Sequence, residues 1–151
     1  MANGFLEFDI ANRTAKVWDA GKKRFTMTNE KELAHSVPSA LQHPRQTQNR
    51  FLHVASVEAT QQEILAALEQ ASGSTWTVTE TTTAKEMDAA GKKLARGDFS
   101  GALTLVRATV FSNTPGLHSN YARDETLAND VLGLPLESVR ETVERVLGNL
   151  Q

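Results

Sequence analysis

Residues 51–79 read FLHVASVEATQQEILAALEQASGSTWTVT, and this stretch decides the fold class. The short apolar run at 51–55 predicts a buried strand. A capping box at 60–63 then predicts a helix that ends at Gly73, and β-branched and aromatic residues predict a second strand at 75–79. This mixture of strands and helices indicates an α/β or α+β domain, a small mixed sheet with flanking helices.

Before this stretch, alternating residues predict three short strands at 5–10, 14–18 and 24–27, joined by two turns into a small meander. The sequence Asn29-Glu30-Lys31-Glu32 has the pattern of a capping box and predicts the start of a helix. Apolar residues follow on one face of that helix, which Pro38 should kink or stop early. These apolar residues are Leu33, Val37 and Leu41.

After the stretch, a third capping box at 83–86 predicts a helix that Gly97 closes, and an apolar helix is expected at 99–111. Residues 112–125 are rich in Asn, Pro, Gly and Ser and predict a loop. Two further helices are expected beyond it, at 126–132 and 137–147.

The composition favours one domain, residues 1–151, with a hydrophobic fraction of 40%. A net charge of −2 gives no broad basic face, which disfavours nucleic acid and anionic lipid as partners. The chain has no cysteine, and its four histidines do not have the spacing of a metal site. No apolar run is long enough to span a membrane and no signal segment is visible, so we expect a soluble cytoplasmic protein.

A nucleotide-binding motif is missing from the sequence. A dinucleotide site needs a G-x-G-x-x-G turn between a strand and a helix, and the chain has neither this motif nor a phosphate loop. The densest glycine cluster, residues 97–101, places Asp98 where it would repel a phosphate. We therefore expect no cofactor to bind this chain by itself.

Several motifs resemble the C-terminal half of fungal NmrA-like and isoflavone-reductase-like proteins. They are an opening strand at 3–6, the strand Asn49 to Ser56 with the helix after it, the segment Lys93 to Ala102, and the closing Leu127-Ala128-Asn129-Asp130-Val131-Leu132-Gly133-Leu134-Pro135. The similarity runs nearly from end to end.

This resemblance implies an atypical short-chain dehydrogenase fold, in which an NAD(P)-binding domain is closed by a smaller substrate-binding part. The chain matches only that smaller part, a truncated NmrA-like fold without the Rossmann half. The lysine that is catalytic in the reductase branch belongs to the missing half. Tyr121 does not supply the Y-x-x-x-K pair, because Glu125 stands where that motif needs lysine.

The loop at 113–125 holds the strongest candidates for catalysis. His118 could act as a general base, Tyr121 could donate to an oxyanion, and Arg123 or Asp124 could set the environment of His118. The family places this region beside the substrate entrance. A solvated surface loop is the alternative interpretation.

Two further candidates lie near the strand predicted at 51–55. His53 is either a catalytic base or a core histidine hydrogen-bonded to backbone. Glu58 follows that strand, where open α/β sheets bind ligands, or else it is a plain acid at a helix entry. Trp18, Trp76 and Phe111 are candidates for substrate binding, against the alternative that they belong to the core or its rim.

Three functions remain open from the sequence. The first is a stand-alone, cofactor-independent enzyme of fungal secondary metabolism that isomerises or cyclises an aromatic or polyketide-like molecule by acid/base chemistry. The second is the substrate-binding portion of an NADPH-dependent reductase, completed by a nucleotide-binding domain. The third is a non-catalytic regulatory module. An apolar edge left by the missing half predicts a homodimer.

Overall fold

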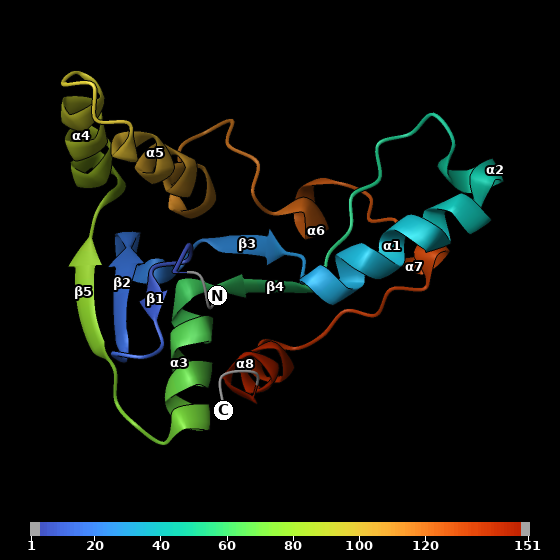
Figure 1. Cartoon of the computed structure of the whole chain (residues 1–151), viewed down its shortest axis with the longest axis horizontal. Helices are drawn as coiled ribbons and strands as arrows, with labels where there is room; N and C mark the ends of the chain where they lie inside the picture. Colours follow the sequence, from blue (N-terminus) through green and yellow to red (C-terminus); the bar gives the residue numbers. More distant parts are fainter. Residues whose placement is uncertain (1–3, 149–151) are drawn as a thin grey trace.

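A computed structural model gives the fold of the chain and describes residues 4–148 (Figure 1). Its elements are β1 (Phe8–Asp9), β2 (Thr14–Trp18), η1 (Asp19–Gly21), β3 (Arg24–Met27), α1 (Glu30–Gln42), α2 (Pro44–Thr47), β4 (Val57–Thr60), α3 (Gln61–Ser72), β5 (Thr77–Thr81), α4 (Thr83–Leu94), α5 (Ser100–Phe111), α6 (Tyr121–Asp124), α7 (Asn129–Leu132) and α8 (Val139–Gly148). No helix within 4–148 is long and apolar enough to cross a membrane.

The strands form two small sheets, with helices flanking them, and this confirms the mixed α/β class predicted from the sequence (Figure 1). One sheet has the order β1-β2-β5, with β1 antiparallel and β5 parallel to β2. The other pairs β3 with β4, antiparallel, so that Phe25 lies opposite Ala59. The predicted meander is therefore wrong in its last step. After the 3-10 turn η1, β3 leaves the first sheet and pairs with β4 instead of β2.

Helix α3 confirms the prediction at residues 60–73. Thr60 Oγ1 accepts a hydrogen bond from Glu63 N at 3.1 Å, and Glu63 Oε2 accepts one from Thr60 N at 2.9 Å, which completes the capping box. Gly73 ends the helix at a positive φ of 62°, a conformation that glycine adopts without the strain of a side chain. The buried face of α3, Ile64 and Leu68, packs into the core.

Aromatic rings from distant segments meet in the core. Trp18 and Phe111 have ring centroids 5.6 Å apart, and Phe25 packs edge-on against Phe111 at 5.5 Å. Trp76, directly before β5, and Phe8 in β1 have ring centroids 6.3 Å apart and belong to the same core cluster. Tilted and edge-to-face pairs of this kind add to the free energy gained from burial alone.

The predicted strand at 51–55 is wrong, because the strand lies at Val57–Thr60. The 51–55 segment is held by other partners. Asn129 bonds Ala55 on both sides, accepting from its N–H at 3.0 Å and donating to its carbonyl at 2.7 Å. His53 forms only an isolated bridge with Leu127, and Phe51 is 98% exposed.

The structure also corrects three smaller predictions: the bounds of one strand, the cap of the helix after it and the effect of Pro38. The strand predicted at 75–79 occupies Thr77–Thr81, in register with β2. The helix after it is capped by Thr82, whose hydroxyl accepts from Lys85 N at 3.3 Å, instead of by the predicted box at 83–86. Pro38 does not stop α1, which runs on to Gln42. The carbonyl that Pro38 leaves without a helical donor belongs to Ala34, which is exposed to water.

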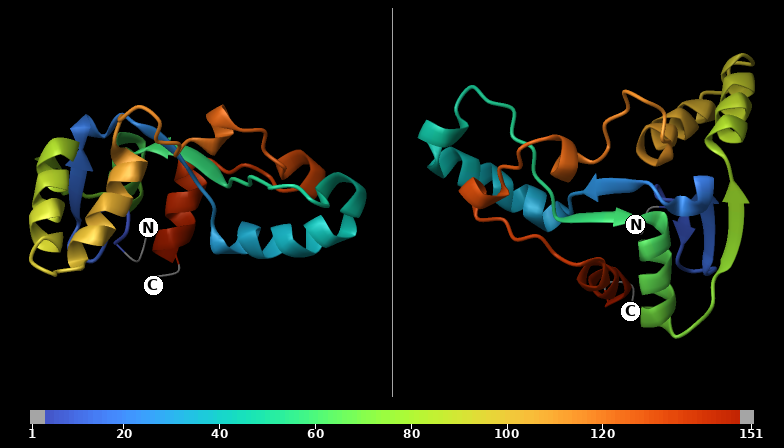
Figure 2. Two further views of the ribbon diagram at one scale, coloured as in Figure 1. Left: turned by 90° about the horizontal axis from the view of Figure 1, so that it is seen from above. Right: turned by 180° about the vertical axis from the view of Figure 1, so that it is seen from behind.

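The C-terminal third is more irregular than predicted. The expected loop at 112–125 contains one helical turn, α6, and the helix expected at 126–132 is reduced to the single turn α7. The helices predicted at 99–111 and 137–147 are confirmed within two residues as α5 and α8. Figure 2 shows that α1, α2 and α7 extend to one side of the body formed by the sheets, α3 and α5.

Candidate functional site

The segment before α6 and the turn before β3 enclose a hollow of about 460 Å³. It lies between two parts of the chain that are distant in sequence. Its lining residues are Lys22, Lys23, Arg24, Asn113, Thr114, Pro115, Gly116, Leu117, His118, Arg123 and Asp124. We call it the basic hollow. It brings together three of the predicted catalytic residues, His118, Arg123 and Asp124.

An acid and a base lie side by side in this hollow. The Nδ1 atom of His118 lies 3.8 Å from Oδ2 of Asp124, and Arg123 holds the same carboxylate with bonds of 2.6 and 3.0 Å. The hydrogen bond from Arg123 lowers the pKa of Asp124, which is therefore ionised near neutral pH. A carboxylate that faces Nδ1 favours the histidine tautomer with its proton on Nδ1, leaving Nε2 to accept a proton.

The segment is anchored to the sheet below it, so it is not simply a solvated loop. Thr26 N donates to Ser119 O at 2.8 Å, and the side chain of Asn120 is buried. The Oδ1 atom of Asn120 accepts from Arg123 N and from Thr26 Oγ1, both at 3.2 Å. These contacts fix the start of α6 and hence the place of Asp124 at its end.

Glu58 contacts the segment that carries His118 through the side chain of Asn120. It lies within β4, not after a strand as predicted, because the strand is shifted. Its carboxylate accepts a hydrogen bond from the Asn120 side chain and lies 3.8 Å from Arg24. The structure thus places Glu58 beneath the segment that carries His118, and Glu58 does not line the basic hollow.

His53 and Tyr121 form a separate pair. Their rings stack at a centroid distance of 5.2 Å and an interplanar angle of 21°. His53 Nε2 also lies 3.8 Å from Glu125 Oε2. Tyr121 is placed against His53, therefore, while His118 has Asp124 as its partner.

The three aromatic candidates for substrate binding lie in the core. Trp18, Trp76 and Phe111 are 1%, 4% and 2% exposed and pack among other core side chains. None of them lines the basic hollow. Their role in binding a substrate stays a prediction.

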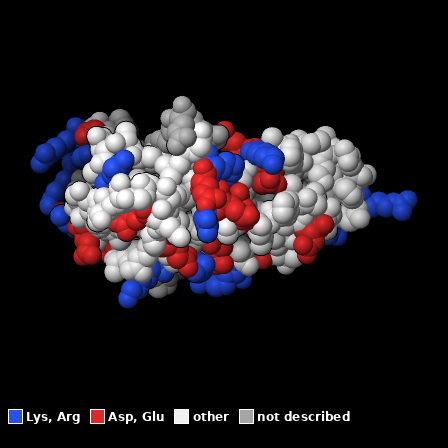
Figure 3. Space-filling model, turned by 90° about the horizontal axis from the view of Figure 1, so that it is seen from below, with Lys and Arg blue, Asp and Glu red and all other residues white. Residues whose placement is uncertain are grey.

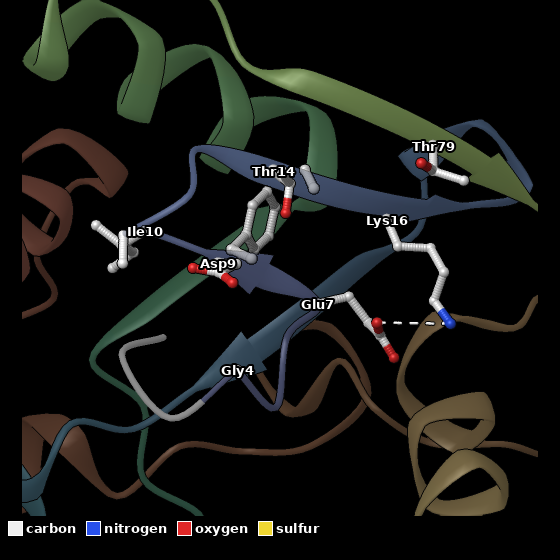
Figure 4. Close-up of a pocket in the computed structure, with 10 residues that line it drawn as sticks. Gly4, Glu7, Asp9, Ile10, Thr14, Lys16 and Thr79 are labelled. Carbon is white, nitrogen blue, oxygen red and sulfur yellow. Dashed lines mark ion pairs between the residues drawn. The ribbon is translucent and has the colours of Figure 1, made fainter.

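A larger hollow of about 780 Å³ lies on the first sheet, beside β1 and β2 (Figure 4). Two of its charged lining residues form an ion pair, because Lys16 lies 3.6 Å from Glu7, and Lys16 also lies 3.3 Å from Glu86 outside the lining. Arg107 adds a second cation at 2.8 Å from Glu7. The larger hollow contains none of the predicted catalytic residues, so we take the smaller basic hollow as the candidate site.

The sequence did not reveal the basic wall of this site. In the sequence, Lys22, Lys23 and Arg24 form a short basic turn between two strands, and the segment they face lies about ninety residues later, as the Lys23 to Ser112 contact shows. Lys23 Nζ donates to the carbonyl of Ser112 at the end of α5. Partial burial, and then the charge of Arg123, lower the pKa of Lys23. The sequence signals for this site were the run of three basic residues at 22–24 and, far along the chain, the loop with Pro115 and Gly116.

Metal binding has no visible support in the structure. Within residues 4–148 no group of three or more His, Asp or Glu side chains is arranged to hold a metal ion.

Comparison with known proteins gives relatives but no family. No protein-family profile matches the chain, and no solved structure matches it. The chain is 31% identical over 142 residues to oxidoreductase poxI of Penicillium oxalicum, a match that covers 94% of this chain and 45% of that protein. It is 29% identical over 143 residues to oxidoreductase aprR of Aspergillus flavus, covering 95% of this chain and 48% of that protein. The chain thus spans somewhat less than half the length of these curated relatives.

Proposed function

We propose that this chain is the substrate-binding part of a fungal oxidoreductase-type enzyme of secondary metabolism, acting on an aromatic or polyketide-like molecule. The observation that carries the proposal is the match itself, which covers 94% of this chain but only 45% of a protein named as an oxidoreductase. The resemblance to the C-terminal half of NmrA-like and isoflavone-reductase-like proteins supports it. Hydride chemistry would then need a nucleotide-binding part, for which this chain has no motif.

Helix α1 offers a second line of support, because it buries polar side chains and exposes apolar ones. The residues it buries are polar, Glu32 and Ser36, whereas its apolar residues Leu33, Val37 and Leu41 are 54%, 58% and 77% exposed. In Figure 3 the end of the molecule that holds α1 and α2 carries few charged side chains compared with the middle. Large exposed apolar surfaces of this kind mark sites of interaction with another protein surface.

The chemistry we assign to this chain is proton transfer to or from the substrate. Asp124 orients His118 through Nδ1, and Nε2 is the atom that would take a proton from the substrate. Arg123 keeps Asp124 ionised, which stabilises the charged imidazole once the proton has moved. The chain has no glycine-rich turn for a pyrophosphate, and this proton transfer uses its own side chains alone.

A second candidate is a stand-alone isomerase or cyclase that needs no cofactor. One observation favours it: the pair of His118 and Asp124 and the basic wall facing it are all supplied by this chain. Proton transfer at such a site does not need a nucleotide. The two candidates differ in whether substrate is converted without any added nucleotide-binding part.

Titration of the chain with NADPH tests whether it needs a separate nucleotide-binding part to bind this cofactor. We expect no binding at micromolar concentrations, because no backbone cradle for the pyrophosphate is present. Isothermal titration calorimetry and the thermal shift of unfolding would both measure this. Micromolar binding by the chain alone would contradict both candidates. Conversion of a substrate without NADPH would then select the stand-alone enzyme over the reductase part.

The apolar face of α1 predicts a homodimer when no nucleotide-binding part covers it. Burial of a Val or Leu side chain is worth about 1.5–3 kcal/mol, so a second copy is stabilised by covering Leu33, Val37 and Leu41. We expect light scattering to give a dimer at tens of micromolar and the Val37→Asp variant to be a monomer. His35→Asp, on the opposite side of the same helix, is the control and should stay dimeric. A monomeric wild-type chain would contradict the prediction.

A further inference from the structure

The basic hollow has an excess of positive charge. Lys22, Lys23 and Arg123 line it as cations, and Asp124 is the one carboxylate among its lining residues in the described chain. Arg24 also lines it, but this guanidinium is paired with carboxylates outside the hollow. Those carboxylates are Glu58, at 3.8 Å, and Glu63. Arg123 is paired with Asp124 inside the hollow, so the imbalance is carried by the two lysines.

The cations are held close to one another. Lys23 is partly buried, and its amine is fixed by the carbonyl of Ser112 while the charge of Arg123 acts on it. Partial burial, and then the charge of Arg123, lower the pKa of Lys23 against an opposing effect of Asp124, so the site destabilises this cation as it stands. An anionic group in the hollow would remove that penalty, because it would attract both Lys23 and Arg123.

We propose that the basic hollow binds a carboxylate of the small-molecule substrate and thereby places the rest of that molecule against His118. The inference rests on the proposed function for the identity of the anion as part of the substrate. A volume of about 460 Å³ suits a small organic acid. Lys22 and Lys23 supply the charge, Arg123 can contribute a second donor, and His118 lies on the same lining.

Benzoate and benzamide test this proposal, because they have the same ring and nearly the same shape but differ in charge. Their binding is followed by NMR through the ring signals of His118 in the intact chain. We expect benzoate to shift these signals with a Kd at least ten-fold lower than that of benzamide. Equal affinities would overturn the proposal, since they would show that the negative charge is not recognised.

Two variants locate the recognition. Lys23→Gln and Lys22→Gln should each weaken benzoate binding about ten-fold and leave benzamide binding unchanged. Lys22 is exposed, so its variant keeps the test valid if Lys23→Gln fails to fold. Lys92→Gln, which removes the same charge on α4, is the matched control and should change neither affinity. Unchanged benzoate binding in both Lys22 and Lys23 variants would overturn the proposal.

Inorganic phosphate separates a substrate carboxylate from a free anion. We expect phosphate to compete with benzoate only weakly, because it lacks the ring that would lie toward His118. Competition as strong as that of benzoate itself would overturn the assignment to a substrate. These readouts do not require turnover. Charge-selective benzoate binding together with full activity of His118→Ala would therefore keep the anion site and reject His118 as the catalytic base.

Discussion

Replacing His118 with alanine is expected to lower turnover by about two to four orders of magnitude, the usual contribution of a positioned general base. The loss should fall mainly on kcat, because Nε2 of His118 acts on the reacting proton while the lysines of the hollow hold the substrate. Liquid chromatography of the converted aromatic or polyketide-like substrate would measure it. Before that substrate is known, ring opening of 5-nitrobenzisoxazole, which needs only removal of one carbon-bound proton, can serve as the probe.

Stability is the control for this variant. The His118 side chain is 65% exposed and contacts Asp124 only at 3.8 Å, so its removal should change the free energy of unfolding by less than about 0.5 kcal/mol. Asp124→Asn should give a smaller loss of turnover, since it leaves the base present but removes its orienting charge. Full activity in a folded His118→Ala protein would contradict our assignment and move the base to His53 or Glu58. Full activity in single variants of all three residues would indicate a site that works by orienting its substrate.

The helix starts show what the sequence can predict. The capping box of Thr60 and Glu63 is found as predicted, because both of its hydrogen bonds are made within four residues. Asn29 also caps its helix, accepting from Glu32 N at 2.7 Å. Its own N–H, however, donates to Ser56 Oγ at 2.9 Å, a residue far along the chain, so the box is only half formed. Local bonds were predictable, and bonds to distant residues were not.

The start of α4 makes the same distinction. Thr82 and Thr83 are both suitable caps, and the prediction that used Glu86 chose the second. Glu86 has different partners in the fold, Thr81 Oγ1 at 2.8 Å and Lys16 at 3.3 Å. The pairing of β5 with β2 thus removed the glutamate from the box and moved the cap back by one residue.

The candidate site was predicted in part for a related reason. His118, Arg123 and Asp124 are within seven residues, so their meeting could be expected from the sequence. Lys22 and Lys23 join them because β3 leaves the first sheet and passes beneath residues 119–120, as the bond from Thr26 N to Ser119 O shows. The predicted meander kept β3 in the first sheet, and that topology would not bring the basic turn at 22–24 next to the loop at 113–125.

Phe111→Ala is expected to cost about 3–5 kcal/mol of the free energy of unfolding, a large share of the roughly 5–15 kcal/mol that a domain has. The ring of Phe111 is 2% exposed and fills the space between Trp18 and Phe25, so its removal leaves a cavity in the core. Urea unfolding would measure this as a lower midpoint with an unchanged slope. Phe99→Ala, just before the same helix, is the matched control, because Phe99 is 81% exposed and its loss should be nearly neutral.

The same pair of variants decides between the two interpretations of the aromatic residues. If Phe111 lined a substrate site, its replacement would raise KM and leave stability nearly unchanged, because a pocket wall already faces solvent when the substrate is absent. If it is a core residue, stability falls and the KM of the remaining folded protein is unchanged. We expect the second result for Phe111. We expect the same for Trp18, because its ring packs against Phe111 at 5.6 Å. A stable Phe111→Ala protein with a raised KM would instead place the substrate between β3 and α5 and move the site away from the basic hollow.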